Sequence, residues 1–183
     1  MSRHLLCVLA VGAALAPLAA PATAQLSFTT PNAEAASAPR PLRDRGPALA
    51  PALVAAQTAV ETCQALGFQV TAAVIDSAAQ PVVILSGDGA AAITQSIAMG
   101  KAVSALRNGR PSADLVTAVA ADKALAARLA ADPQQGVQRG GGIPIRNNGG
   151  VIGAIGISGS PDAGWDIKCA EAGLAKALVP SGK

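Results

Sequence analysis

The spacing of apolar residues changes period several times along the chain. Within Leu49–Leu66, apolar residues such as Leu53 and Cys63 recur at intervals of three and four, which predicts a helix with one apolar stripe. Residues 68–76 change to a period of two, and 81–86 form a second, more uniformly apolar strand after a short turn. A connection this short joins antiparallel strands, so the two stretches predict a hairpin.

Capping residues mark the starts of further helices. Asp88 and Ser112 can each cap a helix that follows, and Ser160 with Pro161 at the first helical position begins the last one. A turn-forming stretch at 146–150 separates two short apolar strands and predicts a second hairpin. The order helix, hairpin, two helices, hairpin, helix indicates an α+β domain with an antiparallel sheet covered by helices. The expected helices are 89–106, 113–130 and 161–178, and the expected strands are 142–145 and 151–158.

Gly153, Gly156 and Gly159 form a G-x-x-G-x-x-G pattern near the C-terminus. A dinucleotide-binding fingerprint needs G-x-G-x-x-G at a strand-to-helix turn, where backbone amides meet the pyrophosphate. Here the first two glycines lie inside an expected strand, an odd number of residues apart, so they face opposite sides of the sheet. We therefore reject a nucleotide site, and the glycines indicate close approach of another backbone or of a flat ligand.

The first residues have the pattern of an export signal. Arg3 and His4 precede the apolar run 5–18, and Ala22–Ala24 is an A-x-A cleavage site. The run is too short for a membrane-spanning helix. We therefore expect residues 1–24 to be a signal peptide and the mature protein to be periplasmic or secreted.

Composition separates a spacer from a domain. Residues 25–48 are rich in Pro, Ala, Ser, Thr and Arg, which predicts a disordered spacer before a domain over 49–180. The chain has 14 Lys and Arg against 11 Asp and Glu, but the excess lies in the signal and the tails, and the domain is formally neutral. Without a basic face, and with Phe68 and Trp165 as its only aromatic residues, the domain is not expected to bind nucleic acid.

Histidine is absent from the expected mature chain, because the single residue His4 leaves with the signal peptide. This absence excludes Ser-His and Cys-His nucleophiles and an ordinary zinc site. The sequence leaves open whether the protein is an enzyme.

Several short motifs follow one another along the expected domain. Their order over roughly Leu49–Leu178 resembles the GlcG/HbpS-like haem-binding family. The motifs are DGA at Asp88–Ala90, Ser96–Ala98, Lys101–Ala102, GGIPI at Gly141–Ile145, GVIGAIGISG at Gly150–Gly159, and Asp166 with Ala170, Ala172 and Gly173.

The resemblance implies a fold, an assembly and a class of ligand. The fold is a profilin- or PAS-like sandwich with a five-stranded antiparallel sheet flanked by helices, and the assembly is a homo-oligomer, a dimer or a larger ring. Some members bind haem, some secreted members degrade or sense it, and others accompany glycolate or diol metabolism. Without a mature histidine, any haem here would be held by Met99, Lys101, a hydroxyl group or apolar contact.

The motifs supply candidate ligand-binding residues, each with an alternative structural role. Asp88 could bond a ligand or cap a helix. Lys101 could meet a carboxylate such as a haem propionate, or extend along apolar surface to water. Met99 is a candidate iron ligand, although methionine also fills gaps in a core. Ser158 and the pair Gly141–Gly142 could line a pocket, but turn geometry alone would also explain the glycines.

Cys63 and Cys169 are the two cysteines of the expected mature chain. In an oxidising compartment such a pair tends to form a disulfide where geometry permits. The bridge would tie the first helix of the domain to the last. Two separate buried thiols are the alternative.

Three functions fit these observations. The first is an exported haem-binding protein that stores, senses or degrades haem. The second is a protein or enzyme that acts on a small carboxylate, with Lys101 and backbone amides as the anion site. The third is an oligomeric interaction module without a ligand.

Overall fold

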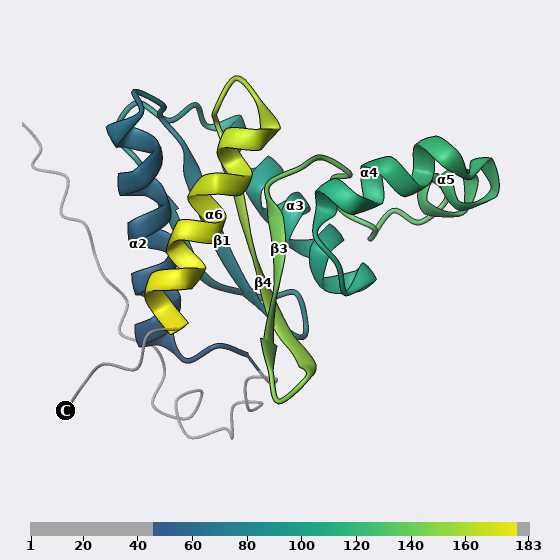
Figure 1. Cartoon of the computed structure of the whole chain (residues 1–183), viewed down its shortest axis with the longest axis horizontal. Helices are drawn as coiled ribbons and strands as arrows, with labels where there is room; N and C mark the ends of the chain where they lie inside the picture. Colours follow the sequence, from purple (N-terminus) through teal and green to yellow (C-terminus); the bar gives the residue numbers. More distant parts are fainter. Residues whose placement is uncertain (1–45, 179–183) are drawn as a thin grey trace, which may run out of the picture. The chain divides into compact units, whose positions relative to one another are not determined.

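The structure is a computed structural model that describes residues 46–178. The predicted signal peptide over 1–24 lies outside the described residues, as does nearly all of the predicted spacer. Within the described part, the order of elements is the predicted one, with α4 and α5 in place of one long helix (Figure 1). The elements are α2 (Leu49–Ala65), β1 (Thr71–Asp76), β2 (Pro81–Ser86), α3 (Ile93–Asn108), α4 (Ser112–Ala121), α5 (Lys123–Ala130), β3 (Gly142–Asn147), β4 (Gly150–Ser158) and α6 (Ala163–Leu178).

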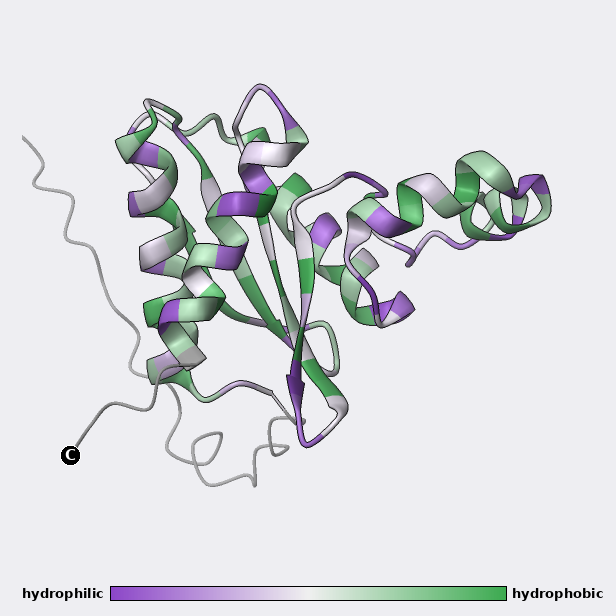
Figure 2. Cartoon of the chain, viewed as in Figure 1, coloured by the Kyte–Doolittle hydropathy of each residue, from purple (hydrophilic) through white to green (hydrophobic). Residues whose placement is uncertain are grey.

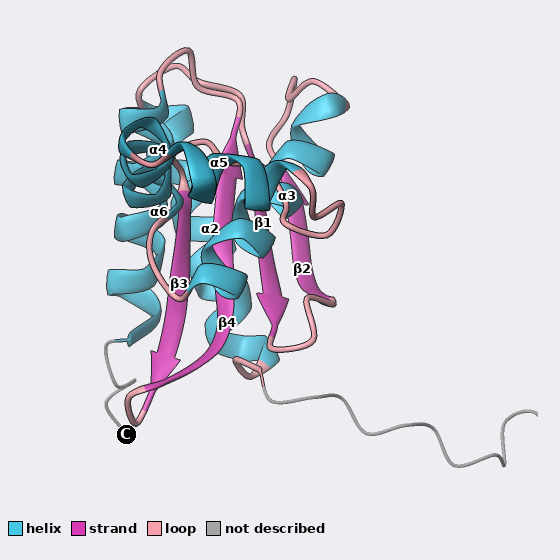
Figure 3. Ribbon diagram, turned by 90° about the vertical axis from the view of Figure 1, so that its right-hand side faces the viewer, coloured by secondary structure: helices cyan, strands magenta, loops and turns pink. Residues whose placement is uncertain are grey.

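The strands form one antiparallel sheet in the order β2-β1-β4-β3 (Figure 3). Each predicted hairpin is present, and the pairing of β1 with β4 joins the two hairpins, with Thr71 opposite Ser158 and Asp76 opposite Gly153. The α+β class is therefore confirmed. The predicted five-stranded sheet is not, because residues 46–178 contain four strands, two from each hairpin.

Helices cover both faces of the sheet. Helices α2 and α6 pack side by side on one face, and α3 lies on the other (Figure 1). As a result every residue of β1 is buried, Val74 towards α2 and α6 and Ile75 towards α3. Figure 2 shows apolar residues along the strands between the helices. The period of two in the sequence thus marks two buried faces, not one buried and one exposed.

Helix α2 turns an alanine-rich face towards α6. Ala56, Val60 and Cys63 are buried as the apolar spacing predicts, but Leu53 is 45% exposed. The reason is close contact between the helices, since a Cβ atom at Gly173 of α6 would collide with the carbonyl oxygen of Ala55. Small side chains are needed where α2 and α6 touch, so the larger side chain of Leu53 lies outside this contact.

The Cys63–Cys169 disulfide is confirmed. It joins α2 to α6, with the two Cα atoms 5.7 Å apart, within the range that a disulfide can bridge. Both residues are completely buried in the core between these helices and the sheet.

Two of the predicted helix starts are displaced, and a third predicted helix is divided in two. Helix α3 begins at Ile93, so Asp88 lies in an exposed turn before it and does not cap it. The expected helix 113–130 is interrupted at Asp122, whose carboxylate accepts hydrogen bonds from two backbone amides and caps α5. Helix α6 begins at Ala163, and the Asp162 carboxylate accepts from the Gly164 amide. A residue type that favours helix N-caps therefore does not always cap a helix in the folded chain.

Gly153 and Gly156 of β4 face opposite sides of the sheet, as predicted, and each allows a close backbone contact. A Cβ atom at Gly156 would collide with the carbonyl oxygen of Ala98 on α3, and one at Gly153 with that of Ile75 on β1. The glycines thus serve backbone packing. Among residues 46–178, the structure has no helix that is long and apolar enough to span a membrane.

Candidate functional site

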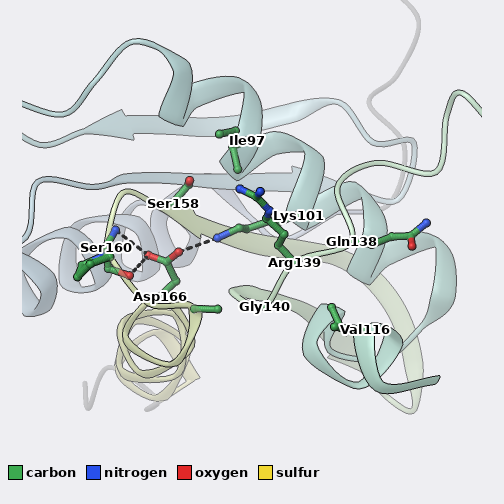
Figure 4. A pocket seen from close by; sticks show the side chains of 11 residues that line it. Ile97, Lys101, Val116, Gln138, Arg139, Gly140, Ser158, Ser160 and Asp166 are labelled. Carbon is green, nitrogen blue, oxygen red and sulfur yellow. Dashed lines mark hydrogen bonds and ion pairs between the residues drawn. The ribbon is translucent and has the colours of Figure 1, made fainter. Parts of the chain in front are cut away.

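A pocket of about 370 Å³ lies where α3, the start of α6 and the loop before β3 meet (Figure 4). Side chains from four different parts of the chain contribute to it, so no single sequence motif defines it. Its volume is within the range of about 300–1,000 Å³ typical of small-molecule sites. The lining residues are Ile97, Lys101, Val116, Gln138, Arg139, Gly140, Ser158, Ser160, Pro161, Ala163 and Asp166.

A buried ion pair forms one wall of the pocket. Lys101 lies on the inward face of α3 with Ala98 and Ala102, and it is 3% exposed. Its ammonium group donates to the Asp166 Oδ2 atom at 2.6 Å and to the Ile157 carbonyl oxygen at 2.9 Å. Lys101 therefore does not extend to water, and its carboxylate partner is supplied by the protein itself.

The second oxygen of Asp166 binds the loop before α6. Its Oδ1 atom accepts from the backbone amide of Ser160 at 3.2 Å and from the Ser160 hydroxyl group at 2.7 Å. Asp166 is 2% exposed, so both of its oxygens are satisfied within the protein (Figure 4). This arrangement fixes the loop and the Lys101 ammonium group relative to each other.

The pair Gly141–Gly142 makes room for Lys101. Gly141 has a φ of +114°, and a Cβ atom there would lie 2.8 Å from Cβ of Asp166 and 3.2 Å from the Lys101 ammonium nitrogen. The Gly142 amide donates to the Ser112 hydroxyl oxygen at 2.8 Å. Ser112 thus holds the start of β3 rather than capping a helix. Gly140, not this pair, lines the pocket.

Three polar groups of the pocket have hydrogen-bonding capacity to spare. An ammonium group has three donors, and Lys101 uses two of them on described residues. Ser158 is 6% exposed, and its hydroxyl group makes no hydrogen bond within residues 46–178. Arg139 is exposed, and its guanidinium group forms no ion pair with the described residues. Since Asp166 is the one acidic residue of the lining, the pocket carries an excess of one formal positive charge.

The structure does not bring Asp88 or Met99 to this pocket. Asp88 is exposed in the turn after β2. Met99 is half-buried and packs against the apolar cluster that contains Ile75 and Ala102. Two residues along a helix are about 200° apart, so Met99 and Lys101 cannot face the same cavity. These contacts fit the gap-filling role for Met99.

Residues 48–175 match the model described as haem degrading protein HbpS-like, which spans most of the described chain. The chain belongs to the HbpS-like family. The resemblance noted in the sequence is thereby confirmed.

Solved structures agree with this assignment. A double mutant of HbpS from Streptomyces reticuli is 30% identical, with a TM-score of 0.66 over 87% of this chain and 97% of that one. The protein ORFY from Klebsiella pneumoniae is 24% identical, with a TM-score of 0.68 over 77% and 97%. A PduOC:heme complex is 23% identical, with a TM-score of 0.66 over 73% and 96%, and it shows a similar fold. A search of curated proteins finds no match.

In this HbpS-like chain the pocket suits the periphery of a haem better than its iron. The lining contains none of the His, Cys or Met side chains that commonly ligate haem iron. Within residues 46–178, no group of three or more His, Cys, Asp or Glu residues could hold a metal ion. Ile97 and Val116 offer apolar surface on which a porphyrin ring could lie, and Ser158 and Ser160 offer hydroxyl groups.

Sequence reasoning missed part of the site. Asp166 belongs to the last motif of the resemblance, and its position in the first turn of α6 is the one feature that distinguishes it. Arg139 and Gln138 lie in the irregular segment between α5 and β3, where neither periodicity nor capping distinguishes them. Val116 resembles any apolar residue of an amphipathic helix. Only the folded chain shows that these residues share a cavity with Lys101.

Proposed function

We propose that this protein is an exported haem-binding protein and that the pocket beside Lys101 is its ligand site. The observation that carries the proposal is a pocket with apolar side chains and an excess positive charge in a domain of the HbpS-like family. The haem complex of the structurally similar PduOC protein supports a tetrapyrrole as the ligand class.

Binding would not depend on a histidine ligand. The apolar surface of Ile97 and Val116 would contact the porphyrin ring, and Ser158 or Ser160 would offer it a hydroxyl group. The bound haem would supply redox chemistry, and the residues of the pocket would hold and orient it. Storage and sensing of haem need only such a site, whereas degradation also needs an oxidant and a reductant.

Assembly and export belong to the same proposal. We infer a homo-oligomer from the family resemblance, and a periplasmic or secreted location from the expected signal peptide over 1–24. The Cys63–Cys169 disulfide supports this location, since disulfides persist in oxidising compartments.

A Soret titration with a matched pair of variants tests the proposal. Val116 in the pocket and Val54 on α2 are each 40% exposed, so replacing either with glutamate should disturb the fold little. We expect wild type and Val54→Glu to give a saturable Soret shift at micromolar haem. Val116→Glu should bind about tenfold more weakly, a difference of about 1.4 kcal/mol, because it places a charge against the apolar wall.

Two results would contradict the proposal. If the wild-type protein gives no saturable Soret shift at micromolar haem, it is not a haem-binding protein. If Val116→Glu and Val54→Glu bind haem equally well, haem binds elsewhere on the surface.

A further inference from the structure

The polar wall of the pocket has a feature that binding of a porphyrin ring does not explain. Lys101 and Asp166 are held at fixed positions by burial and by hydrogen bonds that involve Ile157 and Ser160. Burying an ion pair costs desolvation energy that its own attraction does not always repay. Since the pair lines the cavity, it offers a ligand charged and hydrogen-bonding groups at fixed positions.

Two hydrogen-bond donors remain available on this wall. One is the third N–H of the Lys101 ammonium group, which has no acceptor within residues 46–178. The other is the Ser158 hydroxyl group, which lies on the same face of β4 as Gly156 and therefore points towards α3. Although Ser158 is 94% buried, its hydroxyl group is unpaired and reaches the pocket. Because this hydroxyl group opens on the pocket, a ligand acceptor would take the place of water there.

Charge selects the kind of acceptor. Asp166 neutralises one of the two basic residues in the lining, so one positive charge remains available for a ligand. Arg139 carries the charge at the exposed rim, free of any acidic partner among the described residues. A guanidinium group binds planar, two-oxygen anions best, because its parallel N–H groups match their geometry.

From these groups we infer that the inner wall of the pocket is a carboxylate-binding subsite. Lys101 and Ser158 would donate to one carboxylate oxygen or to both, and Arg139 would close the site from the rim. The carboxylate could belong to a haem propionate or to a small free acid, and the chemistry of the subsite is the same for both. For the propionate the inference rests on the proposed function, and for the free acid it does not.

The experiment uses three probes and three variants of the full chain. The probes are haem, haem dimethyl ester, in which both propionates are esterified, and glycolate as a small free carboxylate. Arg139→Gln and Ser158→Ala each remove one donor. Arg110→Gln is the control, since Arg110 is also an exposed arginine but does not line the pocket. Circular dichroism checks that every variant is folded, and calorimetry or the Soret shift measures affinity.

If the ligand is a tetrapyrrole, haem should bind about tenfold more tightly than its dimethyl ester. Arg139→Gln and Ser158→Ala should weaken haem binding about three- to tenfold, as expected for hydrogen bonds to a charged group, and leave ester binding unchanged. Arg110→Gln should behave as wild type with both probes. If the source is a free acid, glycolate should give saturable heat that Arg139→Gln abolishes, whether or not haem binds.

Three other outcomes overturn the subsite, the haem proposal or both. If haem and its ester bind equally and both pocket variants match Arg110→Gln, the subsite is wrong although the haem proposal stands. If glycolate binds in an Arg139-dependent way and haem does not bind, the haem proposal fails and the subsite stands. If none of the three probes binds, both fail.

Discussion

Cys169 lies one helical turn after Asp166 on α6, so the helix that the disulfide ties to α2 also carries the carboxylate partner of Lys101. Cys169 lies in the core that α2 and α6 form with the sheet, and Asp166 lines the pocket. The covalent link between the first and last helices of the domain thus also restrains one wall of the site.

Loss of Asp166 should destabilise the fold. Asp166→Asn would leave the Lys101 ammonium group buried without a counter-charge, a change that costs about 3–5 kcal/mol in buried pairs. Urea unfolding would show this as a lower free energy of unfolding with a similar m-value. Asp88→Asn is the control, since Asp88 is exposed and its side chain makes no hydrogen bond with described residues. Equal stability of the two variants would contradict a structural role for the pair.

Free thiols should be absent from oxidised protein. Thiol titration of denatured, unreduced protein with the leader removed should find no free cysteine, because Cys63 and Cys169 are joined. Replacing both cysteines with alanine should lower the free energy of unfolding by about 2–5 kcal/mol, since the bridge closes a long loop. Two titratable thiols per chain would show that the protein carries no bridge as purified.

A methyl group at Gly156 should disturb the packing of α3 on the sheet. Gly156→Ala would bring a Cβ atom into the backbone of Ala98 and Ala102, and such overpacking costs about 1–3 kcal/mol. Gly150→Ala, in the same strand but with its nearest contact at 3.6 Å from Asn147, should be nearly neutral. Thermal unfolding of both variants tests the difference. A tolerated Gly156→Ala substitution would mean that α3 can move away from β4 at little cost.

Export should remove the first residues of the chain. Protein recovered from its native host should begin at Gln25, after the A-x-A site at Ala22–Ala24. Mass spectrometry of the intact protein measures this directly. Mature protein that retains Met1 would rule out the predicted cleavage.

Assembly is open to a direct measurement. Light scattering of the protein at micromolar concentration should give the mass of a dimer or a larger ring, as the family resemblance implies. A single species with the mass of one chain would contradict the proposed homo-oligomer, without affecting the haem titration.

Local features of the sequence were sufficient for the order of elements. Both hairpins follow from short turn-forming connections, and the opposite faces of Gly153 and Gly156 follow from the period of two in a strand. The Cys63–Cys169 pair was predictable because these are the two cysteines of the expected mature chain, which allow one intramolecular bridge. Features of this kind depend on neighbours in the chain or on simple counting, so they can be recognised without the fold.

The tertiary structure alone decided the chemistry of the site. Lys101 and Asp166 are 65 residues apart in the sequence and meet because α3 and α6 both approach the end of β4. The same packing determined that Asp88 caps no helix and that Leu53 is exposed. An ion pair or a pocket wall built by distant segments depends on how the helices pack on the sheet. Periodicity, capping and composition report only on the segment in which each residue lies.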